Sequence, residues 1–528
     1  STPSSRPHPW PDLRLLRPPA PRLLLLLLPA TFLLLFFAHP VWTMLSAASA
    51  DGWRWVRIPY VRGHLGTALL QAGLSTALAA AVAAPLVLLH HHRRVRGERL
   101  LLALHAAPFV LPVFVIVFGL QKTVYPAMSP TPLAAVVVAN AYYNYGFAAR
   151  LLLAHLARRP RQLEDAARVL GATPFGAFRR ASLPLLAGPM AGVAVLVFLW
   201  CFASFGVVLL LGASRVETPE TLLFGLLRGF YPRHDRAAVL GLLQLAVNTA
   251  LLLLVLALRR RTRHLPEPAP RPRPPAGPVA HAVAYASAAL ALVPLLAVLS
   301  GSFEVGGRWS LDGWRALRND QFHLATVVAQ SLLYALVSAT AAVALTLLVA
   351  YGAPRGSRLR KLAEAAASLP LGASSLLLGY GLFLAYGSQS WLDLRGTRTL
   401  VLVAHTLLAF PFVARILLPA YAGIDERVED AARLLGAGTL GLARRIHFPL
   451  LQAPLLAAFG FAVALSLADV GASLLLMRPE NAGLPYWIHA WHSSYDPVPR
   501  AASEAMAAIL GGLAVAAYTL TQRLDVRP

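Results

Sequence analysis

Two acidic pairs stand in the same sequence context, 265 residues apart. Residues 164–186 read EDAARVLGATPFGAFRRASLPLL and residues 429–451 read EDAARLLGAGTLGLARRIHFPLL, with 14 of 23 positions identical and no gap. The charged residues are Glu164, Asp165, Glu429 and Asp430. Each pair falls in the first turn of an expected short helix, where free N–H groups and the helix dipole favour negative charge. The sequence therefore predicts two equivalent polar loops.

Glycine and proline define the rest of each loop. Gly171 and Gly436 allow the turn after the short helix, because a residue without a Cβ adopts positive φ freely. Pro184 and Pro449 can occupy the first turn of the following helix without losing a hydrogen bond. Each loop is thus expected to be a short helix, a turn, a second short helix and the entry to an apolar segment.

Long apolar runs surround both loops. Over 528 residues the chain is 57% hydrophobic and 13% charged, with a mean hydropathy of +0.61. A span needs about 20 mostly apolar residues, and continuous rather than alternating runs favour helices over a barrel. We therefore expect an all-α polytopic membrane protein with about twelve transmembrane helices, the first of them an uncleaved span. The expected spans are 23–47, 66–90, 100–121, 132–155, 185–211, 236–258, 279–300, 326–352, 363–386, 399–421, 451–476 and 502–521.

The repeat divides the chain into two pseudo-symmetric halves of six spans, residues 1–258 and 279–528. The same offset holds outside the loops, where Phe147 matches Phe412. The connecting residues 259–278 are rich in arginine and proline, a composition that stays extended. This linker is expected to tether the halves and to help fix their topology.

Arginine and lysine indicate the orientation of the chain. Most of these 47 residues fall in one set of loops when the amino terminus is placed in the cytoplasm. By the positive-inside rule, both repeated loops and both termini are then cytoplasmic. Topology explains the net charge of +24, so lipid and not nucleic acid is the expected partner. The long loops 212–235 and 477–501, on the other side, suit either a docking surface for a soluble protein or an interfacial aromatic belt.

Signatures of catalysis are missing from the sequence. A phosphate-binding loop needs a glycine-rich run ending in Lys-Ser or Lys-Thr, and Lys122 and Lys361, the two lysines, have other neighbours. HExxH and GxSxG do not occur, and the run from His90 to His92 is expected to be a solvated helix cap rather than a metal site. We expect no enzyme activity, no cofactor and no metal in this chain, and any ATPase must be a separate protein.

Polar residues inside spans indicate a substrate path, because they are costly in lipid and usually face a cavity. The fourth span carries a polar patch of Asn140, Tyr142, Tyr143 and Asn144. Asp469, which matches Ser204 of the first half, is the one acid well inside an apolar run, and it contacts a cationic cargo or a gating partner, or it bonds a neighbouring helix. Interhelical hydrogen bonds are expected for the remaining polar residues, Gln71, Gln244, Asn248 and Gln330.

The repeated loops resemble the EAA loop of bacterial ABC importer permeases, in which an acidic residue and two alanines precede a glycine and a proline. The residues that match Glu-Ala-Ala are Asp165, Ala166, Ala167, Asp430, Ala431 and Ala432, with Gly171 and Gly436 as the glycine. Both copies carry Asp where Glu is usual, preceded by a Glu. Two such loops in one chain look most like the fused thiamine and ferric-iron permeases.

The resemblance implies the type I importer permease fold in a bacterial inner membrane. Each loop would seat its short helix in a cleft on one of two copies of a cytoplasmic ATPase subunit. ATP-driven alternating access would move a small solute, a thiamine-like organic cation or ferric iron, from a periplasmic binding protein into the cytoplasm. The alternative is a secondary transporter, which needs coupling charges in mid-span, and beyond Asp469 the sequence offers few.

Overall fold

The computed structural model describes residues 23–157, 162–212, 215–229, 231–260, 273–318, 322–387 and 392–524. Its first half contains η2 (Leu24–Leu26), α2 (Leu27–Leu33), η3 (Leu34–Ala38), α3 (His39–Ala47), α4 (Ala50–Val56), α5 (Pro59–His92), α6 (Glu98–Val110), α7 (Val113–Met128), α8 (Pro132–Ala157), α9 (Gln162–Val169), α10 (Pro174–Ala177), η4 (Phe178–Ser182), α11 (Leu183–Phe202), α12 (Phe205–Leu211), α13 (Pro219–Arg228) and α14 (His234–Arg260). Its second half contains α15 (Pro278–Gly301), β1 (Glu304–Val305), β2 (Arg308–Trp309), α16 (Asp312–Ala316), α17 (Leu324–Gly352), α18 (Arg358–Ser368), η5 (Leu369–Gly372), α19 (Ser375–Ala385), α20 (Arg398–Ala422), α21 (Glu426–Leu434), α22 (Thr439–Leu442), η6 (Ala443–His447), α23 (Phe448–Ala468), α24 (Gly471–Leu476), η7 (Pro479–Asn481), α25 (Leu484–His492) and α26 (Pro497–Leu524). The two strands form a single antiparallel hairpin.

Eight of the described helices are long and apolar enough to cross a membrane, and the number rises to 11 if each of three bent helix pairs is one span. The bent pairs are α6 with α7, α11 with α12, and α18–η5 with α19, at angles of 104°, 51° and 97°. The remaining expected span is α8, a continuous helix of 26 residues that its Asn and Tyr residues make more polar. The all-α polytopic class is confirmed.

The helix breaks meet at one place in the molecule. Pro112 precedes α7 and cannot continue α6, because it has no N–H to donate. Ser374 caps α19 by accepting a 3.1 Å hydrogen bond from the N–H of Leu377. Irregular backbone at membrane depth is tolerated where protein covers it or where it lines a cavity. Ser204, at the third break, lines the same cavity as Ser374 and Val113.

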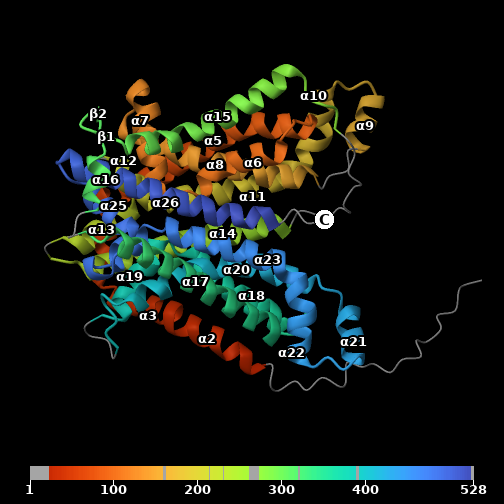
Figure 1. Ribbon diagram of the computed structural model, residues 1–528. Coiled ribbons are helices and arrows are strands. Elements are labelled where there is room, and N and C mark those ends of the chain that lie inside the picture. The colour runs from red at the N-terminus through yellow and green to blue at the C-terminus, as the bar shows by residue number, and fades with distance from the viewer. Residues whose placement is uncertain are drawn as a thin grey trace, which may run out of the picture.

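The long helices run roughly side by side, and both repeated loops project from one end of the bundle (Figure 1). The first loop contains α9 and α10, and the second contains α21 and α22. We call the end of the bundle from which both loops project the loop end. The opposite end carries α13, α16, α25 and the hairpin of β1 and β2 (Figure 1). The two loops therefore share one side, as the sequence predicts.

The long loops at the opposite end are partly folded. Trp487 and Trp491 of α25 pack against Phe322, with ring centroids 5.4 and 4.5 Å apart. Tyr231, by contrast, is exposed. The aromatic belt and the docking surface both stay predictions for this end.

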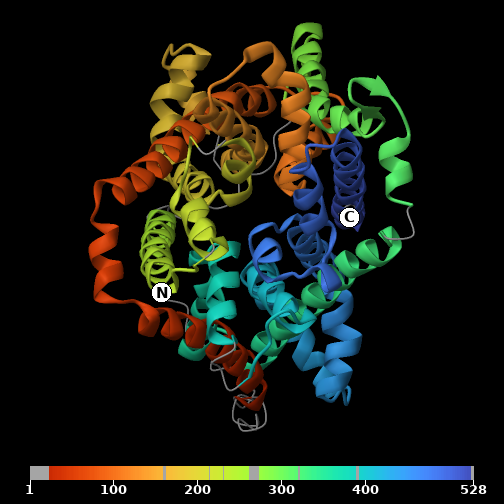
Figure 2. The ribbon, with the colours of Figure 1, turned by 90° about the vertical axis from the view of Figure 1, so that its left-hand side faces the viewer.

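The first span of each half packs against the other half. The amino-terminal helices α2 and α3 contact α17 and α19, whereas α15 contacts α6 and α7 (Figure 2). The Tyr386 hydroxyl donates a 2.8 Å hydrogen bond to the Leu35 carbonyl, and the Tyr142 hydroxyl donates to the Ala291 carbonyl. The sequence halves therefore exchange their first spans in space, which the repeat alone did not predict.

The described end of the linker is bound to the first half. Arg94 and Pro275 form a parallel bridge, in which the Arg94 N–H donates to the Pro274 carbonyl at 2.9 Å. The Arg273 guanidinium donates two 2.8 Å hydrogen bonds to the Glu98 carboxylate. This end is more than the extended tether that composition predicts, while residues 261–272 lie outside the described residues.

A glycine contact allows the exchanged span α15 to pack closely on α7. A Cβ added at Gly119 would overlap the carbonyl of Pro294. We therefore expect Gly119→Ala to destabilise the chain by about 1–3 kcal/mol, as overpacking of a close contact does. Thermal unfolding can be followed with a dye that reacts with Cys201, a buried free thiol.

The matched control is Gly73→Ala in α5, where an added Cβ meets nothing within 4 Å. This variant should keep the Tm or raise it slightly, because alanine favours helix. Equal Tm values for the two variants would contradict the close packing of α7 against α15.

Candidate functional site

The two repeated loops have the same backbone geometry. Gly171 has a φ of +85° and Gly436 a φ of +83°. The N–H of the following residue donates to the carbonyl of the motif's second alanine, at 3.0 Å onto Ala167 and at 2.9 Å onto Ala432. This bond, together with a left-handed glycine, ends each helix in a Schellman turn. The helix, turn and second helix expected from the sequence are present in both copies.

Each loop then enters its membrane helix through a π-helical turn, η4 before α11 and η6 before α23. Pro184 and Pro449 lie in the first turn of those membrane helices, where the sequence predicts them, and both are exposed. A π turn in an α-helix is uncommon and often marks a functional segment. The equivalence of the loops thus extends beyond the glycine turn.

The glycine turns hold large apolar side chains out at the loop end. Their exposed fractions are 86% for Val169, 87% for Leu170, 69% for Phe175, 80% for Leu434, 90% for Leu435 and 81% for Leu440. The three from each loop occupy equivalent positions in the repeat, and we call the six the tip residues. Gathered apolar side chains at a protein surface mark an interaction site. Sequence reasoning named the motif's charged and small residues but missed these side chains.

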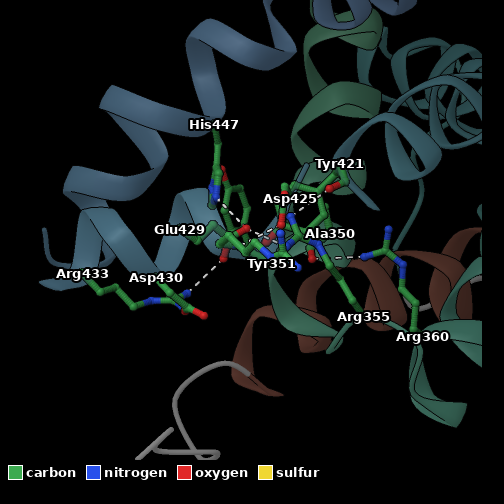
Figure 3. Close-up of polar contacts among 11 residues, drawn as sticks. Ala350, Tyr351, Arg355, Arg360, Tyr421, Asp425, Glu429, Asp430, Arg433 and His447 are labelled. Carbon is green, nitrogen blue, oxygen red and sulfur yellow. Dashed lines mark hydrogen bonds and ion pairs between the residues drawn. The ribbon is translucent and has the colours of Figure 1, made fainter. Parts of the chain in front are cut away.

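Glu429 lies at the base of the second loop, where its side chain is 5% exposed. Its carboxylate is 2.6 Å from Arg355, 3.0 Å from Arg433 and 3.1 Å from His447 (Figure 3). Arg355 follows α17, whereas His447 ends η6. Glu429 therefore fastens the second loop to the membrane helices.

Asp430, the acid that matches the EAA motif, is placed differently. Its side chain is 49% exposed and lies 2.7 Å from Arg433 (Figure 3). An exposed pair of this kind adds little stability. Of the two neighbouring acids, Glu429 is the buried anchor and Asp430 is available at the surface.

The anchor depends on the protonation of Glu429. Burial by itself would raise the pKa of this carboxyl, but Arg355 and His447 outweigh burial and hold the pKa below its ordinary value. A depressed folded-state pKa means that the stabilisation is complete above about pH 4.3, the ordinary range of glutamate, and is lost as the pH falls through the lower folded-state pKa.

We expect a nitroxide label on Leu435→Cys to show this pH dependence, because Cys201 is buried and stays unlabelled. Label mobility should be constant from pH 8 to pH 5 and should rise only as the pH falls below the ordinary pKa of glutamate, about 4.3. The same label in a Glu429→Gln chain should be mobile at every pH. Identical profiles for the two chains would show that Glu429 does not anchor the loop.

The first loop is built on the same plan with different side chains. Glu164 is buried like Glu429, and with Asp165 and Arg168 it lines a pocket that also contains His91 and Arg93. His90 and His91 are buried, so the expectation of a solvated cap is wrong for them, because the first loop and the linker end cover the end of α5. Within the described part of the chain no group of three or more His, Cys, Asp or Glu residues is arranged to hold a metal.

A cavity of about 280 Å³ lies between the two halves. Residues that line it from the first half include Phe109, Asn140, Tyr143, Asn144, Trp200, Ser204 and Asn248, and from the second half Ser374, Leu408, Phe412, Leu465 and Asp469. Several of these are repeat partners, such as Tyr143 with Leu408 and Trp200 with Leu465. The cavity therefore lies where the two halves face each other.

One contact beside this cavity is repeated with different chemistry. In the first half the Ser204 hydroxyl donates a 2.9 Å hydrogen bond to the Asn140 side chain. In the second half the matching residues are Asp469 and His405, with 3.4 Å between carboxylate and ring. The Asp469 carboxylate also accepts hydrogen bonds from the N–H and hydroxyl of Ser473, at 2.9 and 3.1 Å. Asp469 thus lines the cavity, and its carboxylate also binds Ser473 of α24 and lies beside His405.

Of the four residues of the fourth span that were expected on the substrate path, three line the cavity and one does not. Tyr143 and Asn144 line the cavity, and so does Asn140, whose amide is bonded to Gln71 and Ser204. Tyr142 instead points its hydroxyl at the carbonyl of Ala291 in α15.

The structure also tests two of the expected interhelical hydrogen bonds and adds two aromatic residues to the cavity. Gln71 does bond other helices, through Cys201 and Asn140, but Asn248 lines the cavity and its side-chain oxygen has no partner within the described structure. Phe109 and Trp200 were missed, because an aromatic residue in an apolar run carries no signal of which way it faces.

Two equivalent loops at one end of a helical membrane body, with a cavity between the halves, define a membrane transport permease. Residues 73–264 and 314–527 match the family described as binding-protein-dependent transport system inner membrane component, and the chain belongs to this family. It is a family of transporter permeases rather than of enzymes, and its members work with an ATPase and a substrate-binding protein. The chain is a multi-pass inner-membrane protein. The first match begins after α3 and the second after α15, so the exchanged spans lie outside the matched cores.

Individual relatives show which permeases of this family the chain resembles. The thiamine transport system permease protein ThiP of Salmonella typhimurium is 28% identical over 480 residues, which cover 87% of this chain and 88% of the relative. ThiP of Escherichia coli is 28% identical over 457 residues, covering 80% of this chain and 82% of the relative. A probable molybdenum ABC transporter permease of Haloferax volcanii is 30% identical over 210 residues, covering 38% of this chain and 76% of that protein. The resemblance to a fused, two-loop permease is confirmed.

Proposed function

We propose that this chain is the permease of an ATP-driven importer for a thiamine-like organic cation. The observation that carries the proposal is the equivalence of the two loops, each with a glycine turn and three exposed apolar tip residues. In this proposal the loop end and both termini face the cytoplasm, and a periplasmic binding protein delivers cargo at the opposite end.

The coupling role follows from how the loops are built. The tip residues would enter an apolar cleft on the ATPase, while Asp165 and Asp430 would offer charge beside them. Glu429, and by equivalence Glu164, would transmit the resulting motion, because a buried ion pair joins the loop to the membrane helices. The two helix ends, built from Ala166, Ala167, Gly171, Ala431, Ala432 and Gly436, are alike, so two copies of one ATPase polypeptide would serve both loops.

Closure of an ATPase dimer would then bias the permease between two states. A ligand shifts such an equilibrium only by its different affinity for the two states. The cavity lies between the two halves, where a rearrangement of one half against the other would open it to either side. ATP itself would bind the partner subunits and not this chain.

The relatives and the cavity lining both favour an organic cation as cargo. The ThiP proteins match this chain over most of both lengths, whereas the molybdenum permease matches 38% of this chain. Among the cavity-lining residues, all of them described, Asp469 is the one charged side chain, and no Arg, Lys or His accompanies it. Such a lining suits a cation better than an oxyanion, and ferric iron rests on the resemblance alone.

Co-purification tests the coupling proposal. A tagged ATPase expressed with this chain should retain it in mild detergent, and native mass spectrometry should give two ATPase copies for each permease chain. Recovery of the permease with no ATPase would contradict the proposal and favour the secondary transporter.

A further inference from the structure

We infer that the cavity between the halves is itself a binding site for a planar organic cation that carries an N–H donor, and that the first half supplies most of this site. The inference rests on the proposed function and adds a recognition site within the permease. Three features of the cavity support this site: an aromatic wall, two amide oxygens without hydrogen-bond partners, and a lining without positive charge.

The aromatic wall is formed by Phe109, Tyr143 and Trp200. The Phe109 ring lies 4.8 Å from the ring of Trp200 and 5.8 Å from that of Tyr143. Phe147 supports the wall from behind, with its ring 4.5 Å from Phe109 and 4.7 Å from Trp200. Such a packed group of rings offers a rigid face on which a planar cationic ring can stack.

Two amide oxygens accompany this wall. Asn144 and Asn248 line the cavity and are each 2% exposed. Their Oδ1 atoms accept no hydrogen bond within the described structure. The Asn144 amide is held in place, because its Nδ2 donates to the Asn140 carbonyl at 2.8 Å. A buried acceptor without a donor is costly. Both oxygens are almost fully covered in this state, so a cargo N–H group would pair with them, and relieve that cost, once the lining shifts to admit it.

The charge of the lining agrees with a cationic cargo. Asp469 lines the cavity on the side of the second half, and none of the described lining residues carries a positive charge. Because Asp469 is already bonded to His405 and Ser473, it contributes a negative potential rather than a direct ligand. A second buried acid, Glu220 of α13, lies outside the lining, and neither of its carboxylate oxygens has a hydrogen-bond partner within the described structure.

The pseudo-symmetry shows that the site is one-sided. The repeat partners of Tyr143, Trp200 and Asn144 are Leu408, Leu465 and Ala409. In the proposed function the two loops are alike because each binds a copy of the same ATPase. The two walls of the cavity, by contrast, differ. A single asymmetric cargo needs only one wall with matching aromatic and polar groups. The second half provides aliphatic side chains at the same positions.

Direct binding to the purified full chain in lipid nanodiscs tests the inference. The probes are labelled thiamine, whose aminopyrimidine carries an NH₂ donor, and oxythiamine, in which a carbonyl replaces it. We expect saturable thiamine binding that weakens about tenfold or more in Tyr143→Leu and Trp200→Leu. Each substitution copies the residue that the second half has at the same position, so folding should tolerate it.

Asn144→Ala separates recognition from structure. It should weaken thiamine binding about tenfold and leave the weaker oxythiamine binding unchanged, because the lost acceptor matters only for a ligand with the donor. Tyr142→Phe, on the same helix but facing α15, is the matched control and should bind both probes normally. Thermal unfolding of each variant checks that the chain is folded.

Two results would overturn the inference. One is no saturable thiamine binding to the wild-type chain, and the other is equal weakening of both probes by Asn144→Ala in a folded chain. The proposed function is tested separately in the same preparation, by stimulation of ATP hydrolysis with thiamine-loaded binding protein. Stimulation without direct binding would sink the cavity site alone, whereas direct binding without stimulation would sink the coupling proposal alone.

Discussion

Replacing Leu170 and Leu435 together with aspartate is expected to abolish binding of the ATPase. Burying each leucine would contribute roughly 1.5–3 kcal/mol, and a buried unpaired carboxylate adds a further cost. The combined loss of at least about 4 kcal/mol corresponds to roughly a thousandfold in affinity. Surface plasmon resonance of the ATPase on permease nanodiscs measures this loss.

The fold should survive this double substitution. Both leucines are at least 87% exposed, and surface changes of this kind usually alter stability by less than about 0.5 kcal/mol. Tyr231→Asp, an exposed apolar residue at the opposite end, is the matched control and should bind the ATPase normally. Each single variant should retain one ATPase copy. Wild-type affinity in the double variant would show that the tip residues are not the docking surface.

The second large effect is expected at the base of the second loop. Glu429→Ala leaves Arg355 and His447 without their shared partner, and breaking a buried ion pair in this way typically costs about 3–5 kcal/mol. The loss should appear as a lower Tm and as faster hydrogen exchange across residues 426–442. Exchange at the first loop should not change, since its own acid, Glu164, is intact.

Asp430→Asn is the control for this prediction, because the neighbouring acid is half exposed and contributes at most about 1 kcal/mol. Combining Glu429→Ala with Arg355→Met should cost less than the sum of the two single changes, since the residues share one interaction. If Asp430→Asn destabilised the chain as much as Glu429→Ala, the division between anchor and surface acid would be wrong.

The loops could be predicted from the sequence because their structure is local. A glycine with positive φ ends a short helix, and a proline starts the next one, within about 20 residues in each copy. The duplication made the pattern readable, since two loops in register are hard to explain by chance. The class of protein follows from these loops and from the apolar runs around them.

Contacts between distant segments could not be predicted in this way. Arg355 and Glu429 carry no pairwise signal in one sequence, so the buried Glu429 and the half-exposed Asp430 looked alike. The exchange of α3 and α15 between halves is equally non-local, because an apolar span can pack on either half. The same limit explains Trp200 and Asn248, whose direction toward the cavity depends on helix rotation.

ATP-dependent uptake of labelled thiamine by proteoliposomes tests whether this chain is the permease of an ATP-driven importer. The vesicles contain this chain and its ATPase, with ATP on the side of the loops and thiamine-loaded binding protein on the other. We expect transport toward the ATP side that requires ATP and stops in the Leu170→Asp, Leu435→Asp chain. Equal transport driven by a proton or sodium gradient without ATP would contradict it and identify a secondary transporter.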